Sequence, residues 1–375
     1  MSTFLQGRLA KLKEKGTYRT LPGTVKGTDF WSNDYLGFAA LRDRETAEPK
    51  QAGATGSRLI SGDLDVYHQI EAGIAESHLA PAALVFNSGY TALLGLLSAL
   101  LTRTDTIIYD ELSHACCRDG IRLSPAKSYR FRHNDTLHLR ARLKNLKSTG
   151  QVFVLTESRF SMDGDEAPLA ELVSICEEAG AHLIVDEAHA GGLDGNKGAG
   201  LCVKHDLQDR IFARVITYGK AFGTHGAAVL GSEELRDYLI NTARPFIYTT
   251  GMAQAQWVGI ALAYKHIDLY HGREYERLQY NILHYQKAVS NRHLREIASR
   301  HDGPIQTISL PGNERVLTAE NACREAGLLV KAIRHPTVPT SQERLRICLH
   351  SFNTHDEIDR LVTTLNEVVS TFAGQ

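Results

Sequence analysis

Lys220 and Asp186 each end an apolar run that is typical of a buried β-strand. Lys220 lies in a glycine-flanked turn after residues 212–216, and Asp186 ends the run at residues 182–186. A lysine that forms a Schiff base and an aspartate that keeps a pyridine nitrogen protonated are the two groups that pyridoxal phosphate (PLP) chemistry requires. A lone lysine in such a turn is typically a surface residue, but this ordered pair predicts a PLP site.

Two histidines follow predicted strands in the same way. His189 comes three residues after Asp186, where it can donate to the phenolic oxygen of the cofactor ring or serve as an interface histidine. His114 follows a predicted strand that ends near Asp110, where its ring can stack on the cofactor. A capping or core histidine is the alternative for His114.

The turn Asn87-Ser88-Gly89-Tyr90-Thr91 lies between a predicted strand and a predicted helix. Free N–H groups and the helix dipole favour an anion at such a helix start, and Gly89 permits close approach of the backbone. Thr217 precedes Lys220 by three residues and can add a hydroxyl to the same phosphate. Such turns are common, so this one alone is weak support for a phosphate site.

Two loops lack the full pattern of a nucleotide site or a calcium site, and a pair of arginines has two possible roles. The glycine-rich residues 53–62 lack the Gly-Lys-Ser/Thr of a Walker loop, and the acidic residues 161–165 lack the other ligands of an EF-hand. Arg344 and Arg346 flank Leu345 at the start of a predicted strand. An arginine there can clamp a carboxylate in a bidentate manner, or both can be solvated residues of an edge strand.

Predicted helices and strands alternate from residue 65 onward. We expect strands at 83–86, 107–109, 128–131, 152–156, 182–186, 212–216 and 227–230, and helices at 65–79, 90–101, 113–123, 137–146 and 169–179. Strands separated by helices of this length pair in parallel, and ligand sites lie beyond their carboxyl ends. The pattern predicts an N-terminal arm (1–45), a large α/β domain with a mostly parallel sheet (46–270) and a smaller α+β domain (271–375). In the smaller domain we expect strands at 305–309, 329–333 and 345–349.

The composition excludes several classes of partner. The 42 Lys and Arg residues nearly balance the 43 Asp and Glu residues, which leaves a net charge of -1 and no global attraction for nucleic acid or an anionic membrane. The six cysteines contain no Cys-x-x-Cys pair, and the most apolar stretch, Leu93–Leu101, is too short to span a bilayer. We therefore expect a cytoplasmic protein with reduced thiols and no metal site.

Together these motifs resemble the α-oxoamine synthase family of fold-type I PLP-dependent transferases. The resemblance covers nearly the whole chain, through segments in the family's order at residues 32–37, 56–58, 87–90, 110–115, 132–135, 157, 161–165, 186–189, 219–220, 247–250 and 344–347. It implies a PLP enzyme that works as a homodimer, with the active site at the subunit interface.

The resemblance also implies roles for individual residues. Lys220 would carry the cofactor and move the substrate proton, Asp186 would pair with the pyridine nitrogen, and His114 would stack on the ring. The remaining predicted cofactor contacts are His189, Gly89, Tyr90, Thr217, Ser161, Thr249 and Thr250, the last two reaching the partner subunit. The predicted substrate contacts are Asn33, Arg346 and, at the far end of the acyl chain, Arg19.

Within the family, the segment Ser88-Gly89-Tyr90 is similar to the biotin-pathway branch, which condenses L-alanine with a pimeloyl group carried on coenzyme A or on a carrier protein. The same chemistry with glycine and acetyl-CoA, or with serine and a long acyl chain, stays open. So does a catalytically silent partner subunit, although such a subunit needs none of Lys220, Asp186 and His114. A serine hydrolase is disfavoured because no Gly-x-Ser-x-Gly elbow occurs.

Overall fold

The computed structural model describes residues 3–14, 17–44, 51–335 and 337–372. The chain divides into two compact units, Asn33–Leu278 and the combination of Met1–Ser32 with Gln279–Gln375. The predicted boundary at 270/271 and the observed division both fall within one long helix, α10 (Gln254–Ser290). The predicted N-terminal arm is divided between the two units.

The unit Asn33–Leu278 is built around a seven-stranded sheet with the order β2-β8-β7-β6-β5-β3-β4. The strands are β2 (Ala82–Phe86), β3 (Thr106–Asp110), β4 (Lys127–Phe131), β5 (Val152–Glu157), β6 (His182–Asp186), β7 (Ala213–Thr217) and β8 (Ala227–Gly231). Only β8 runs against its neighbours, pairing antiparallel with both β2 and β7. The prediction of a mostly parallel sheet is confirmed.

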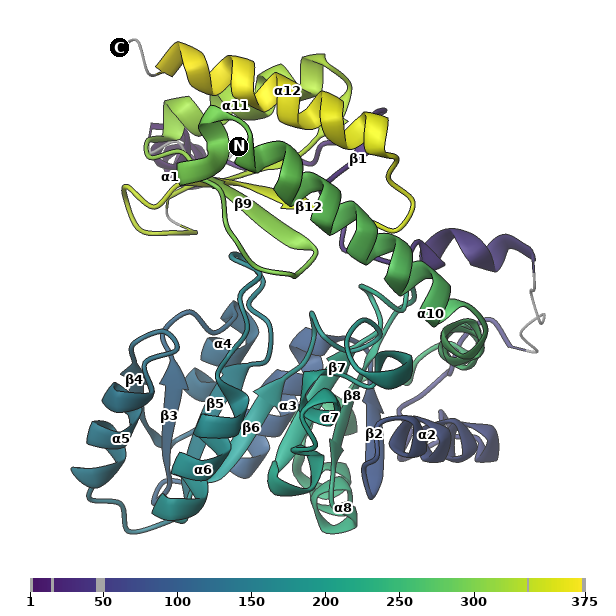
Figure 1. Cartoon of the computed structure of the whole chain (residues 1–375). Helices are drawn as coiled ribbons and strands as arrows, with labels where there is room; N and C mark the ends of the chain where they lie inside the picture. The colour runs from purple at the N-terminus through teal and green to yellow at the C-terminus, as the bar shows by residue number, and fades with distance from the viewer. Residues whose placement is uncertain (1–2, 15–16, 45–50, 336, 373–375) are drawn as a thin grey trace. The chain divides into compact units, whose positions relative to one another are not determined.

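Helices cover both faces of this sheet, as Figure 1 shows. The helices of this unit are α2 (Asp65–Ser77), α3 (Gly89–Leu100), α4 (Ala115–Leu123), α5 (Thr136–Lys144), α6 (Leu169–Ala179), α7 (Leu201–Lys204), α8 (Glu233–Thr242), α9 (Arg244–Ile247) and the first part of α10. No helix was predicted at α7, α8 or α9.

Successive strand residues enter two different cores, because side chains alternate across a sheet. Ile107 packs in the core that contains α3 and α4, whereas Ile108 packs in the core that contains α6. Ile184 and Val185 of β6 divide in the same way. Burial on both faces explains why these strands are continuous apolar runs in the sequence.

The other unit is α+β, as predicted. Its three-stranded antiparallel sheet has the order β11-β12-β9, and a short parallel pair joins β1 to β10. The strands are β1 (Thr28–Asp29), β9 (Ile305–Ser309), β10 (Leu328–Leu329), β11 (Lys331–Ile333) and β12 (Arg344–Cys348); the helices are α1 (Thr3–Glu14), α11 (Asn313–Glu325), α12 (His355–Phe372) and the end of α10. The strand expected at 329–333 is divided between β10 and β11, which belong to different sheets. Among the described residues, no helix is long and apolar enough to cross a membrane.

Candidate active site

Asp186 ends β6 and Lys220 follows β7. These two strands are adjacent and parallel, so both residues lie at the carboxyl edge of the large sheet. Asp186 is the last residue of β6 and pairs in register with Val215 of β7, five residues before Lys220. The Lys220 Nζ donates to the Thr217 Oγ1 at 3.2 Å. The backbone N–H of Ala188 donates to the Asp186 Oδ1 at 2.9 Å, which fixes the carboxylate at the end of its strand.

The surroundings of Asp186 suit a cationic ring partner. Asp186 is buried, with 3% of its surface exposed, and burial raises the pKa of its carboxyl group, while the Lys220 charge acts in the opposite direction. A buried carboxylate needs a positive or hydrogen-bonded partner to offset its lost hydration. A protonated pyridine nitrogen supplies one, so this residue fits the PLP ring.

The start of α3 forms a close cradle with Thr217. Ser88 caps the helix, accepting from the Thr91 backbone N–H, so the next free N–H groups face outward from the helix start. A Cβ added at Gly89 would overlap the methyl group of Thr217, which places β7 directly against this turn. The backbone donors at this helix N-terminus fit a phosphate group. The Thr217 hydroxyl donates to the Ala188 carbonyl at 3.3 Å and accepts from the Lys220 Nζ at 3.2 Å.

His189 belongs to a short chain of hydrogen bonds. The Tyr35 hydroxyl lies 2.8 Å from the His189 Nδ1 and donates to the Asn33 Oδ1 at 3.1 Å. Tyr35 is fully buried, so its hydroxyl has a fixed position. It links His189, a predicted cofactor contact, to Asn33, a predicted substrate contact.

His114 is held through its backbone, and its side chain is exposed. Its backbone N–H donates to the Glu157 Oε1 at 2.6 Å. Its Nδ1 lies 2.8 Å from the Cys116 Sγ and accepts from the Cys116 backbone N–H at 3.3 Å, so the capping interpretation of His114 is confirmed at the start of α4. The hydrogen bond with Cys116 raises the pKa of His114. Glu157 ends β5 and is buried, and burial and then the nearby Asp186 carboxylate raise its pKa. An exposed ring on a fixed backbone is available to stack on a cofactor.

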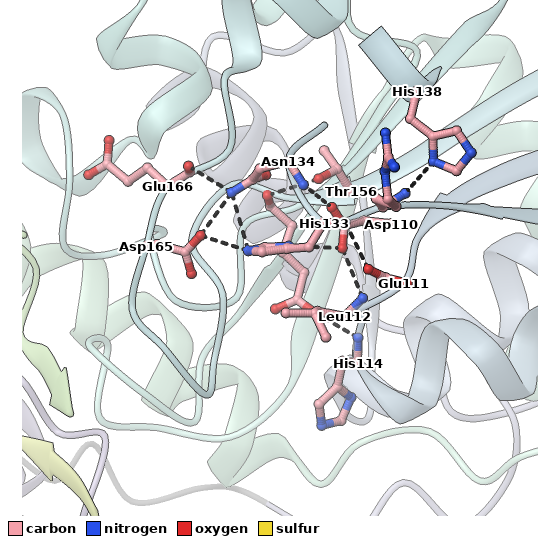
Figure 2. Close-up of polar contacts among 12 residues, drawn as sticks. Asp110, Glu111, Leu112, His114, His133, Asn134, His138, Thr156, Asp165 and Glu166 are labelled. Carbon is pink, nitrogen blue, oxygen red and sulfur yellow. Dashed lines mark hydrogen bonds and ion pairs between the residues drawn. The ribbon is translucent and has the colours of Figure 1, made fainter. Parts of the chain in front are cut away.

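A third histidine, His133, is held between two carboxylates next to this site. Figure 2 shows His133 lying between Asp110, the last residue of β3, and Asp165 of the loop after β5. Its Nδ1 lies 3.0 Å from the Asp110 Oδ1, and its Nε2 lies 2.8 Å from the Asp165 Oδ2. Although burial opposes the charge, hydrogen bonds to both carboxylates raise the pKa of His133 to about 9. The Asp165 loop also contains Ser161, so His133 ties that loop to β3.

The remaining predicted residues occupy varied positions. The Tyr90 hydroxyl donates to Asp119, and the Asn87 side-chain amide donates to Thr249 Oγ1 at 3.4 Å and to the Thr250 carbonyl at 3.2 Å. These contacts lie within one chain and leave the predicted role across a subunit interface untested. In the other unit, Arg346 is buried in β12 with its Nη1 2.9 Å from the Cys348 Sγ, and Arg19 is exposed.

Tyr35, Glu157, His133 and Cys116 are site residues to which sequence reasoning gave no role. All four lie in or next to segments that carry the family resemblance. The family resemblance therefore pointed to the segments that contain these four residues. Their functions depend on contacts that form only in the folded chain.

Comparison with known proteins supports the assignment of these residues to a PLP site. The sequence model of the family described as aminotransferase class I and II matches residues 25–365. The chain is 40% identical over 362 residues to 8-amino-7-oxononanoate synthase of Acidithiobacillus ferrooxidans, covering 93% of this chain and 91% of the relative. It is 39% identical to the Emericella nidulans protein of that name, covering 90% and 88% of the two chains.

Solved structures share the fold over nearly the whole chain. Serine palmitoyltransferase from S. paucimobilis, solved with a bound PLP–myriocin species, has a TM-score of 0.89 at 24% identity and covers 100% of this chain and 98% of its own. The 8-amino-7-oxononanoate synthase of Francisella tularensis has a TM-score of 0.78 at 29% identity, covering 92% and 99%. The chain therefore belongs to the class I and II aminotransferase family and, within it, to the PLP-dependent α-oxoamine synthases.

Proposed function

We propose that this chain is an 8-amino-7-oxononanoate synthase, which condenses L-alanine with a pimeloyl thioester and releases carbon dioxide and the thiol carrier. The observation that carries the proposal is the Lys220–Asp186 pair at the carboxyl edge of the sheet, in a chain 36–40% identical to curated synthases of that name. The reaction belongs to biotin biosynthesis. We also infer a cytoplasmic homodimer with the active site at the subunit interface.

The residues that would hold PLP come from four strand ends. Asp186 would hold the proton on the ring nitrogen, and His189, positioned by Tyr35, would donate to the phenolic oxygen. The Gly89 turn and Thr217 would bind the phosphate, with Tyr90 and Ser161 as further contacts. Thr249 and Thr250 would reach the phosphate of the partner subunit. PLP, when bound, draws electron density away from the substrate Cα and so makes its proton removable.

Lys220 would carry the proton transfers. In the structure its Nζ is held by Thr217, at the end of a rigid strand. Displaced from the cofactor by the amino acid, the same amine can take the Cα proton of alanine and later return a proton to Cα. A positioned acid–base group of this kind contributes about 100-fold to 10,000-fold in rate.

The remaining steps form one carbon–carbon bond and release the thiol and carbon dioxide. The Cα carbon forms a bond to the acyl carbon as the thiol leaves, and the bond from Cα to the carboxylate then breaks to release carbon dioxide. Overall, one proton is consumed. The exposed His114 ring would cover the reacting face and polarise the new carbonyl oxygen. Asn33 and Arg346 would bind the alanine carboxylate, and Arg19 the far end of the pimeloyl chain.

The nearest competing assignment is a serine palmitoyltransferase. Its solved structures match this fold with the higher TM-score, but at 24% identity that match shows the fold alone. The sequence identity of 40% to the 8-amino-7-oxononanoate synthase favours alanine and a pimeloyl donor.

Product formation by PLP-loaded protein tests the proposal. L-alanine, glycine and L-serine are each combined with pimeloyl-CoA, acetyl-CoA and palmitoyl-CoA, with a pimeloyl carrier protein as a further donor, and products are identified by mass spectrometry. We expect product from alanine with a pimeloyl donor. A product only from glycine or only from serine would refute the substrate assignment but retain the family chemistry. Full turnover by Lys220→Ala would refute the role of the lysine.

A further inference from the structure

Two cysteines at the start of α4 lie close to Asp186, the last residue of β6. One sulfur atom each from Cys116 and Cys117, and a carboxylate oxygen of Asp186, all lie within 4.8 Å of one another. All three residues are buried, with at most 4% of their surface exposed. Of the residues that the structure describes, only this group of His, Cys, Asp and Glu side chains has the spacing of a metal site.

The ligand types select a class of ion. Two thiolates and one carboxylate suit a borderline-soft cation such as Zn²⁺, whose bonds to sulfur and oxygen are about 2.0–2.3 Å long. Tetrahedral geometry with such bonds separates the ligand atoms by about 3.3–3.8 Å. The ligand atoms lie within 4.8 Å of one another, so binding would draw them closer by at most about 1–1.5 Å.

A fourth ligand is available beside the cluster. The Nδ1 of His114 lies 2.8 Å from the Cys116 Sγ and caps α4 by accepting from the Cys116 backbone N–H at 3.3 Å, so it can reach an ion bound to that sulfur by giving up the cap. Structural zinc sites commonly have four ligands of these types. The helix α4 begins one residue after His114, and the sulfur atoms of its two cysteines lie within 4.8 Å of the Asp186 carboxylate at the end of β6.

We propose that the cofactor-free chain binds one Zn²⁺ through Cys116, Cys117 and Asp186, and that zinc and PLP exclude one another. The exclusion rests on the proposed function, in which the Asp186 carboxylate pairs with the cofactor ring and His114 stacks on it. Neither side chain can serve both partners at once. Zinc binding forms two sulfur–zinc bonds and one oxygen–zinc bond and releases the two thiol protons, so it needs no oxidant or other reactant.

Titration of the full-length protein with Zn²⁺ tests the site. Protein stripped of cofactor is titrated by calorimetry, as wild type, as the Cys116→Ser/Cys117→Ser variant and as Cys323→Ser, a matched change of a buried cysteine elsewhere. We expect one zinc ion per chain in the wild type and in Cys323→Ser, and a loss of affinity of at least about 100-fold in the double variant. Wild type saturated with PLP is expected to bind zinc at least about tenfold more weakly, and zinc to weaken PLP by the same factor.

A second measurement does not depend on the folding of the double variant. Co²⁺ bound to the cofactor-free wild type is expected to show thiolate-to-cobalt charge-transfer absorption in the near ultraviolet, which PLP abolishes. Equal zinc stoichiometry and affinity in wild type and the double variant, or no thiolate band with cobalt, would overturn the site. Zinc binding unchanged by saturating PLP would overturn the exclusion. Absence of product in the turnover assay, with zinc binding intact, would instead refute the proposed function alone.

Discussion

The pKa of His133 provides the sharpest quantitative prediction from this structure. The ring lies between Asp110 and Asp165, and their hydrogen bonds raise its pKa from 6.5 to about 9. At about 1.36 kcal/mol per pH unit, this rise corresponds to about 3.4 kcal/mol in favour of the protonated ring in the folded chain. The side chain is 23% exposed, so solvent screens the pair only in part.

The sign of the pH dependence follows from linkage. A histidine whose pKa is raised by folding contributes its full stabilisation below the unfolded pKa of 6.5, where both states are protonated. This stabilisation falls by about 1.4 kcal/mol per pH unit between pH 6.5 and about 9 and is lost above it. In His133→Gln this contribution is absent at every pH. The difference in free energy of unfolding between wild type and variant is therefore expected to shrink by about 3 kcal/mol across that range.

Two assays check this reasoning. The ring is titrated by NMR of ¹³C-labelled histidine, with His133→Gln used to assign its signal, and the two proteins are unfolded in urea from pH 6 to about 9.5. Asp165→Asn is expected to lower the measured pKa, whereas His138→Gln, a neighbouring histidine bound to the Arg132 backbone N–H, leaves it unchanged. A His133 pKa near 6.5, or a difference in unfolding free energy that is constant with pH, would refute the argument.

Three further predictions concern the cofactor and its partners. Lys220→Ala is expected to lower kcat by at least about 100-fold, because the proton acceptor is lost. The far-ultraviolet circular dichroism of this variant is expected to match that of the wild type. A smaller loss of kcat would assign the proton transfer to another group. Gly89→Ala places a methyl group against Thr217 and is expected to weaken PLP binding about 5- to 100-fold, the equivalent of about 1–3 kcal/mol of overpacking. Its control, Gly73→Ala, has no atom within 4 Å of the added carbon, and equal PLP affinities in a fluorescence titration would contradict the cradle. Tyr35→Phe removes the hydroxyl shared by His189 and Asn33 and is expected to lower kcat/KM about 5- to 100-fold, from about 1–3 kcal/mol for the unpaired groups; an unchanged kcat/KM would contradict that link.

Much of the large unit could be predicted because its signals are local. The apolar run at 182–186 becomes β6 with the predicted bounds, and Ile305–Ser309 is β9 as expected. Periodicity and strand-end residues act over a few positions, so they are readable without the tertiary structure. The helices α7 and α9 are only four residues long, too short for a periodic pattern, and were missed.

The sequence by itself determined the residue types and the strand ends that carry the chemistry: Lys220 after β7, Asp186 at the end of β6 and a glycine turn after β2. Tertiary structure alone decided which groups meet. Antiparallel insertion of β8 between β2 and β7 brings Gly89 against Thr217, and Tyr35 reaches His189 across 154 residues of sequence. The same packing encloses His133 between two carboxylates and turns two cysteines towards Asp186. Such contacts depend on strand order and on the burial of both faces of the sheet, which arise from the packing of the whole unit and leave no local pattern in the sequence.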